Sequence, residues 1–69
     1  MKISARNVLK GKVIDVTLGQ TTAHVRIDIG GGKVVTSSIT NEAVAELGLK
    51  VGDEAYAVIK ASDVLVGRD

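Results

Sequence analysis

The segment Thr22-Ala23-His24-Val25-Arg26-Ile27-Asp28-Ile29 alternates apolar and polar side chains along most of its length. Its odd-numbered positions from 23 to 29 hold alanine, valine and isoleucine, and its even-numbered positions from 24 to 28 hold histidine, arginine and aspartate. Because successive side chains of a β-strand point to opposite faces of a sheet, this pattern predicts a strand with one buried face and one solvated face.

The residues that follow predict that this strand is one arm of a hairpin. Gly30-Gly31-Gly32 comes directly after it, and Lys33-Val34-Val35-Thr36-Ser37-Ser38-Ile39 resumes a strand-like composition, as expected of two strands joined by a glycine turn. The alternative for three glycines is a phosphate-binding loop. Such a loop needs a following Lys-[Ser/Thr] pair and a helix, and neither is present, so the sequence favours the hairpin.

Further strands are predicted on both sides of the hairpin. Residues 8–18 are rich in β-branched side chains, with a bulge expected at residues 13–14, and residues 19–20 offer a turn. Residues 54–59 have the composition of another strand, and residues 63–66 that of a last short one. The sequence therefore predicts five strands.

A short helix is predicted between the third and fourth strands. Thr40 can cap the N-terminus of residues 41–47, Glu42 suits the positive end of the helix dipole, and Gly48 supplies the residue after the C-terminus. This order of elements predicts an all-β fold, a small five-stranded OB-like barrel with one short helix between strands 3 and 4. Without a proline, a linker or a repeat, residues 1–69 are expected to form a single domain.

The size and composition of the chain predict a homo-oligomer. A chain of 69 residues buries only about 60% of its unfolded surface, so its core is marginal without further support. The absence of cysteine excludes disulfides and thiolate metal sites, and His24 is a single histidine without partners for a metal site. Yet 45% of the residues are hydrophobic while Tyr56 is the one aromatic, and such an aliphatic surplus is typical of a subunit interface.

Charge and targeting signals exclude several classes of function. The formal net charge is +1 and the two signs are interspersed, so neither nucleic acid nor a membrane surface is an expected partner. The N-terminus lacks the apolar core of a signal peptide, and no apolar run approaches transmembrane length, so a cytoplasmic protein is expected. No nucleophile is paired with a base and no cofactor fingerprint is present, so the sequence predicts neither an enzyme nor a bound cofactor.

Two short segments far apart in the sequence concentrate hydrogen-bond donors. They are Ile3-Ser4-Ala5-Arg6-Asn7 and Ile59-Lys60-Ala61-Ser62, and neither contains an aspartate or a glutamate. If folding brings them together, they would suit a small oxyanion, because charge-assisted hydrogen bonds are the strong ones. The alternative is structural: Arg6 and Lys60 are solvated charges, and the serines and the asparagine serve turns or strand ends. The residues alone leave both interpretations open.

Four motifs in a fixed order resemble those of one protein family. They are Ser4-Ala5-Arg6-Asn7 followed by Leu9-Lys10-Gly11-Lys12-Val13, then Ile39-Thr40, then Glu46-Leu47-Gly48-Leu49-Lys50-Val51-Gly52, and then Ala57-Val58-Ile59-Lys60-Ala61-Ser62. From residue 3 to residue 67 the chain is similar to the molbindins. These are small molybdenum-pterin-binding-type (Mop) proteins whose fold also appears in molybdate-responsive regulators and in the TOBE domains of transport ATPases.

The resemblance implies an OB-like domain that assembles as a hexamer, a trimer of dimers, and stores molybdate and tungstate at subunit interfaces for molybdenum homeostasis. The oxyanion-binding residues that it implies are Ser4, Arg6, Asn7, Thr40, Lys60, Ala61 and Ser62. Among these, Ala61 and Ser62 would contribute through backbone N–H and hydroxyl groups. The chain departs from the pattern at Ala43, where related domains often carry serine, so that contact would fall to the backbone.

The chemistry of molybdate is compatible with such a site. Molybdate is a tetrahedral dianion whose oxygens only accept hydrogen bonds, so its pocket needs donors on all sides and about two positive charges. Arg6 and Lys60 can supply the charges, and the helix capped by Thr40 can add free N–H groups. A barrel this small has no deep cavity for a dianion, so the pocket is expected between subunits. The alternative function is a structural or regulatory oligomerisation module of the OB type that stores no ligand.

Overall fold

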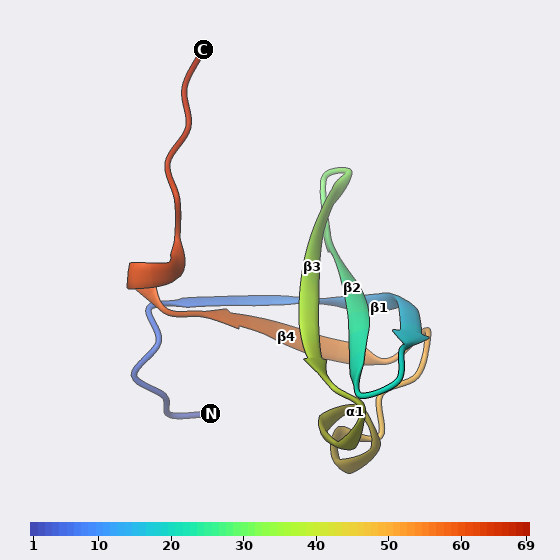
Figure 1. The fold of residues 1–69 in the computed structure, drawn as a ribbon. Helices are drawn as coiled ribbons and strands as arrows, with labels where there is room; N and C mark the ends of the chain where they lie inside the picture. Colours follow the sequence, from blue (N-terminus) through green and yellow to red (C-terminus); the bar gives the residue numbers. More distant parts are fainter.

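The alternating segment forms most of β2 (Thr22–Gly30), around which the sheet is built. In the computed structural model, which describes residues 1–69, β2 pairs on one side with β1 (Asn7–Leu18) and on the other with β3 (Lys33–Thr40). β4 (Glu54–Ile59) pairs with β1, so the sheet order is β3-β2-β1-β4 and every pair is antiparallel (Figure 1). The predicted hairpin of β2 and β3 is confirmed.

The core is small and wholly aliphatic. Its six buried side chains come from β1, β2, α1 and β4: Val13, Ala23, Val25, Ile27, Val44 and Ala57. Three of them are the alternate positions of β2 that the sequence pattern assigns to the buried face, and the polar positions between them are exposed. No polar or charged residue is buried. The stability of the single chain therefore rests on few contacts, as its length indicates.

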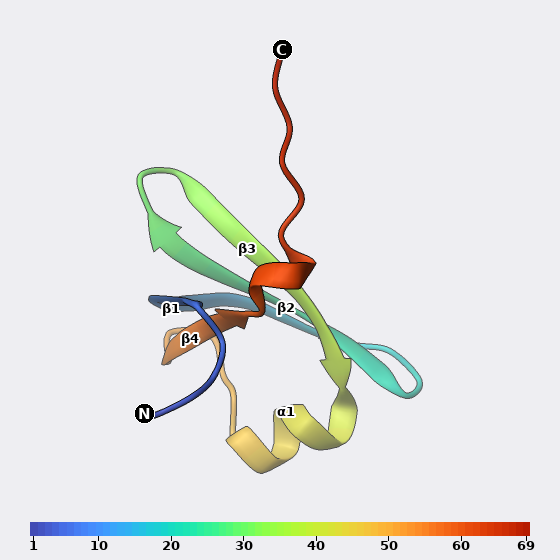
Figure 2. The same cartoon turned by 90° about the vertical axis from the view of Figure 1, so that its left-hand side faces the viewer.

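β1 is a long strand that serves two partners. Its residues 12–18 pair with β2 and its residues 7–12 pair with β4. The register with β2 shifts between Val13 and Asp15, which confirms the predicted bulge. Because a bulge increases the local twist, the sheet curls there, and the ribbon of β1 and β4 crosses the hairpin of β2 and β3 steeply (Figures 1 and 2).

Gly11 lies at a close approach between the backbones of β1 and β2. A Cβ atom at this position would lie 2.7 Å from Cγ2 of Ile27 and would overlap the carbonyl oxygen of Asp28. Glycine is the residue that allows two backbones to approach so closely within a sheet. This close approach of β1 to β2 therefore requires glycine at position 11.

One helix, α1 (Asn41–Leu47), closes one end of the sheet. It begins and ends as predicted, with Thr40 as its N-cap and Gly48 in the left-handed conformation after its last turn. Val44 is its one buried residue, whereas Leu47 is exposed beside the sheet. None of the helical segments has the length and apolar character needed to cross a membrane.

The structure has four strands, and the fifth strand predicted at residues 63–66 is absent. The 3₁₀ turn η1 (Ala61–Asp63) follows β4, and residues 65–69 make no backbone hydrogen bond. They extend away from the sheet, which leaves the side chains of Leu65 and Val66 94% exposed (Figures 1 and 2). A strand requires a neighbour, and this tail leaves η1 away from the open edges of β3 and β4. A single chain therefore forms a curled but open sheet and not a closed five-stranded barrel.

Replacing Gly11 with alanine should destabilise the chain by about 1–3 kcal/mol, the usual cost of forcing extra atoms into closed space. Urea unfolding followed by circular dichroism measures this change. Gly67→Ala is the matched control, because a Cβ there would meet nothing within 4 Å. Equal unfolding midpoints for the two variants would show that β1 does not need this close approach.

Candidate functional site

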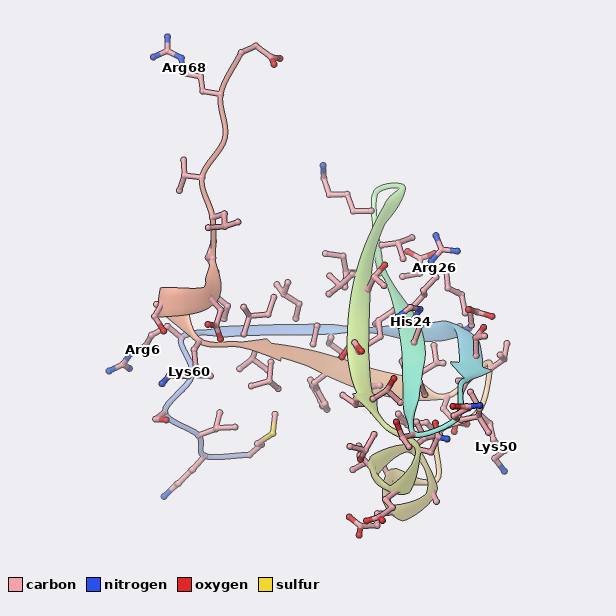
Figure 3. All side chains as sticks on the ribbon, viewed as in Figure 1. Arg6, His24, Arg26, Lys50, Lys60 and Arg68 are labelled. Carbon is pink, nitrogen blue, oxygen red and sulfur yellow. The ribbon has the colours of Figure 1, made fainter.

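The pairing of β1 with β4 brings the two donor-rich segments together within one chain. Asn7 at the start of β1 is the partner of Ile59 at the end of β4, and Asn7 Nδ2 donates a hydrogen bond of 3.2 Å to the Ile59 carbonyl oxygen. Arg6 and Lys60 are the next residues outward, so they lie at the same end of the ribbon (Figure 3). The fold thus joins segments that the sequence separates by more than fifty residues.

The two cations at this end have no carboxylate partner. The one ion pair of the structure joins Lys10 Nζ to Glu54 Oε1 at 3.3 Å, further along the same ribbon. Asp63 is the acidic residue nearest to Lys60 in the sequence, and it forms an ion pair with neither Lys60 nor Arg6. Neighbouring positive charges without a counterion attract an anion.

Hydroxyl and backbone N–H groups flank these cations in the sequence of the two segments that meet. The set is called the donor cluster below: Ser4, Arg6, Asn7, Lys60, Ala61 and Ser62. In η1 the Asp63 N–H donates to the Lys60 carbonyl at 2.9 Å, which leaves the N–H groups of Ala61 and Ser62 without a partner in the chain. Most of the cluster is exposed, so a single chain presents an open surface of donors and not an enclosed pocket.

Thr40 and Ala43, the other two predicted site residues, lie elsewhere. They are at the start of α1, which is well separated from Arg6 and Lys60 (Figure 3). Thr40 Oγ1 accepts a hydrogen bond of 3.1 Å from the Ala43 N–H, so this N–H already has a partner. The hydroxyl proton of Thr40 is still free to donate to another acceptor. One chain does not bring Thr40 and Ala43 to the donor cluster.

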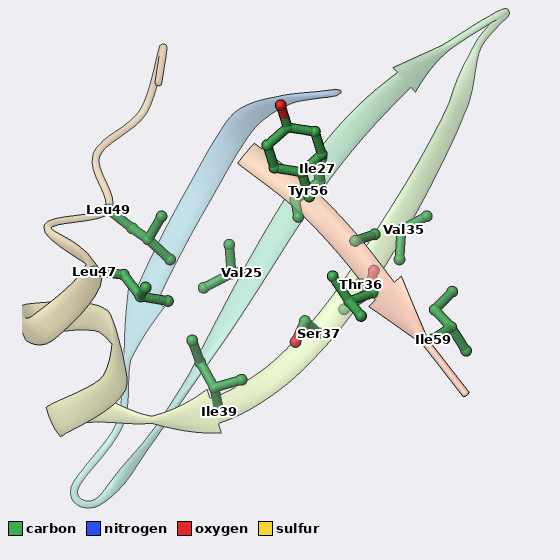
Figure 4. Close-up of a pocket in the computed structure, with 12 residues that line it drawn as sticks. Val25, Ile27, Val35, Thr36, Ser37, Ile39, Leu47, Leu49, Tyr56 and Ile59 are labelled. Atoms are coloured by element: carbon green, nitrogen blue, oxygen red, sulfur yellow. The ribbon is translucent and has the colours of Figure 1, made fainter. Parts of the chain in front are cut away.

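The largest hollow is an apolar groove whose position cannot be read from the sequence. It has a volume of about 430 Å³, and it lies between the open edges of β3 and β4, over Val25 and Ile27 of β2 (Figure 4). Ten of its 12 lining residues are hydrophobic. Ile59, which precedes Lys60, is one of them, so the groove adjoins the donor cluster. The excess of aliphatic residues in the composition indicates that such a surface exists. Composition does not show where on the fold those residues lie.

A second hollow, of about 280 Å³, lies at the turn between β1 and β2. Its five lining residues are Thr17, Leu18, Gly19, Thr22 and His24. No group of three or more His, Asp or Glu side chains in the structure is arranged to hold a metal ion. The donor cluster and the apolar groove are therefore the two candidate binding surfaces of the chain.

Known proteins share both the sequence and the fold. Residues 3–66 match the family model of the TOBE domain. The chain is 60% identical over 67 residues to a probable molybdenum-pterin-binding protein of Haemophilus influenzae, and the match covers 97% of each protein. Among solved structures, the fold matches a molybdate-binding protein from Sporomusa ovata with a TM-score of 0.92 at 35% identity, covering 99% of this chain and 100% of that one.

A further solved structure is that of the cytoplasmic molybdate-binding protein ModG with molybdate bound. Its TM-score is 0.90 at 51% identity, and the match covers 94% of this chain and 46% of that one. Together these matches define the chain as a TOBE domain. Within that class, the chain belongs to the molbindin, or Mop, family. The resemblance seen in the four sequence motifs is confirmed.

Replacing Thr40 with alanine should cost about 0.5–2 kcal/mol of stability, because the Ala43 N–H loses its capping acceptor. Thermal unfolding of the parent and the variant measures the loss. Thr40→Ser keeps a hydroxyl at the cap and should lose much less. If the serine and alanine variants unfolded at the same temperature, the capping hydrogen bond would contribute nothing to the stability of the chain.

Proposed function

We propose that this chain is a cytoplasmic oxyanion-binding protein that holds molybdate and tungstate at subunit interfaces, for storage and homeostasis of molybdenum. It acts as a binding protein and not as an enzyme. The observation that carries the proposal is the donor cluster, in which Arg6 and Lys60 lie together without a carboxylate partner. Relatives named for molybdenum-pterin or molybdate binding supply the identity of the anion.

The donor cluster matches the chemistry of a tetrahedral dianion. Molybdate oxygens only accept hydrogen bonds, and the cluster offers the Arg6 guanidinium, the Lys60 ammonium, the Asn7 amide, two serine hydroxyls and two backbone N–H groups. The two cations balance the charge of the anion. Hydrogen bonds from charged donors are about twice as strong as neutral ones, so these two side chains would supply most of the affinity.

A pocket made only of donors also selects among anions. Hydrogen phosphate carries an O–H group that needs an acceptor, and leaving this group unpaired costs roughly 1–3 kcal/mol, or about ten- to a hundredfold in affinity. Sulfate has no such proton, so its rejection depends on the size of the pocket. Tungstate is nearly the size of molybdate and would bind beside it.

Placing the anion between subunits accounts for the exposure of the cluster. Charged contacts that stay in water contribute little, so the open cluster of one chain needs a second wall that excludes water. Thr40 has a free hydroxyl proton and lies too far away to contribute within its own chain. In an assembly, Thr40 and the start of α1 from one copy would close the pocket over the donor cluster of another.

The same assembly would complete the barrel. Val64, Leu65 and Val66 are apolar and exposed, and the groove between β3 and β4 is apolar and open. The tail of a second copy laid in this groove would place a fifth strand between two unpaired edges and bury apolar surface on both partners. Reciprocal exchange gives a dimer, and three dimers give the hexamer.

The alternative is a structural or regulatory module that assembles without storing an anion. In that case the donor cluster would only satisfy chain ends. A pterin is a weaker candidate ligand: the groove is lined by aliphatic side chains, with only Thr36, Ser37 and the Tyr56 hydroxyl to meet a polar ring system. Equilibrium dialysis against molybdate separates the storage protein from the structural module, because the module retains none.

Loss of either cation should weaken molybdate binding by about 2–5 kcal/mol, which is roughly 30-fold or more. Calorimetric titration of the parent, Arg6→Ala and Lys60→Ala measures the change. Lys33→Ala, at the far tip of the hairpin, is the control for loss of one positive charge. If both site variants bound molybdate as the parent does, the donor cluster would not be the site.

Molybdate at 100 times its dissociation constant should stabilise the assembly by about 2.7 kcal/mol for each site, because a ligand of the folded state shifts unfolding by mass action. Differential scanning calorimetry should show a higher thermal midpoint with molybdate than with phosphate at the same concentration. The midpoint of Arg6→Ala should move much less. A parent midpoint that molybdate leaves unchanged would argue against an anion held by the folded assembly.

A further inference from the structure

The connection between β4 and the exposed tail is also one half of the donor cluster. Lys60 follows β4, Ala61 and Ser62 begin η1, and residues 64–69, called the tail from here on, follow η1. Asp63 alone separates the proposed anion contacts from the apolar residues of the tail. An interaction that orders one end of this connection therefore restricts the other end.

This connection is weakly held in the single chain. Every residue from 60 to 69 is exposed, and only two backbone hydrogen bonds order the segment. They run from the Asp63 N–H to the Lys60 carbonyl at 2.9 Å and from the Val64 N–H to the Ala61 carbonyl at 3.3 Å. Exposed hydrogen bonds and few apolar contacts characterise segments that open readily. The chain by itself does not fix the direction of its tail.

We propose that oxyanion binding and tail docking are coupled through η1, so that the anion latches the tail onto a second copy of the chain. This inference rests on the proposed function, since it needs an anion at Lys60 and Ser62 and a tail in the groove of a partner. A bound anion orders η1 and sets the direction in which residues 64–66 leave it. A docked tail orders the same turn from its other end. Whichever of the two binding events occurs first includes the entropic cost of ordering the turn. The free energy of the other event then becomes more favourable.

The coupling makes Leu65 and Val66 positioning residues for an anion that they do not touch. Coupling between two sites is reciprocal, so a docked tail tightens anion binding by the same factor by which a bound anion tightens tail docking, and a change that prevents docking removes that factor from anion binding. Such factors usually lie between about five and 150. The assembled protein would then hold molybdate more tightly than a free chain, and dissociation of the subunits would release it.

The test is a molybdate titration of the parent and of the Leu65→Asn/Val66→Thr double variant. Both substitutions are neutral and close in shape, so they add no charge near the anion. Val51→Thr is the matched control, because Val51 is also exposed and lies outside the groove and the tail. Titrations are made at chain concentrations at which light scattering gives the three proteins the same mass. The double variant should bind molybdate about five- to 150-fold more weakly, and the control should match the parent.

A second measurement on the parent needs no substitution. Hydrogen exchange followed by NMR should show slower exchange of the Leu65 and Val66 amides in saturating molybdate than in the same concentration of chloride. A parent that bound no molybdate would refute the proposed function itself. A parent that bound molybdate would refute the coupling alone if these amides exchanged equally in both salts. The coupling would also be refuted, and the proposed function would stand, if the double variant bound as tightly as the parent at equal mass.

Discussion

The antiparallel ladder between β1 and β4 is the interaction on which the rest of the structure depends. It gives Ala57 its place in the core, and it sets Arg6 beside Lys60 because Asn7 and Ile59 are partners at its end. The ladder is possible because β1 extends beyond its pairing with β2. Gly11, which precedes the bulge in β1, admits the close approach of the Asp28 carbonyl. It also leaves the far edge of β4 unpaired, and that edge borders the groove. Core, donor cluster and open edge therefore share one cause.

The parts of the fold that the sequence predicts correctly have local physical signals. Side-chain alternation identifies β2, because burial of one face needs no knowledge of distant residues. Thr40 and Gly48 identify the ends of α1, since capping joins groups only a few residues apart. The predicted fifth strand fails for the opposite reason. Residues 64–66 have the composition of a strand, but pairing requires a neighbour that a single chain does not place beside them.

The candidate site divides in the same way. The absence of acidic residues around Arg6 and Lys60 is visible in the sequence, and the fold does bring these two residues to one place. Their separation from Thr40 could not be predicted, because it depends on the steep crossing of two ribbons. The capping bond that occupies the Ala43 N–H was hidden as well, since the sequence indicates a cap without showing which donor it uses. The groove could not be predicted either, because it forms between the edges of β3 and β4, and the sequence does not show that these two edges face each other.

The ladder has a further consequence for the order in which the chain folds. The Asn7–Ile59 contact spans 52 positions, whereas the hairpin and α1 involve near neighbours. Long-range contacts are entropically the hardest to make, so local elements tend to form before them. A chain that has formed only its hairpin presents Arg6 and Lys60 on unconnected ends and has nothing with which to retain an anion. Arg6 and Lys60 therefore come together only after the β1–β4 ladder has formed.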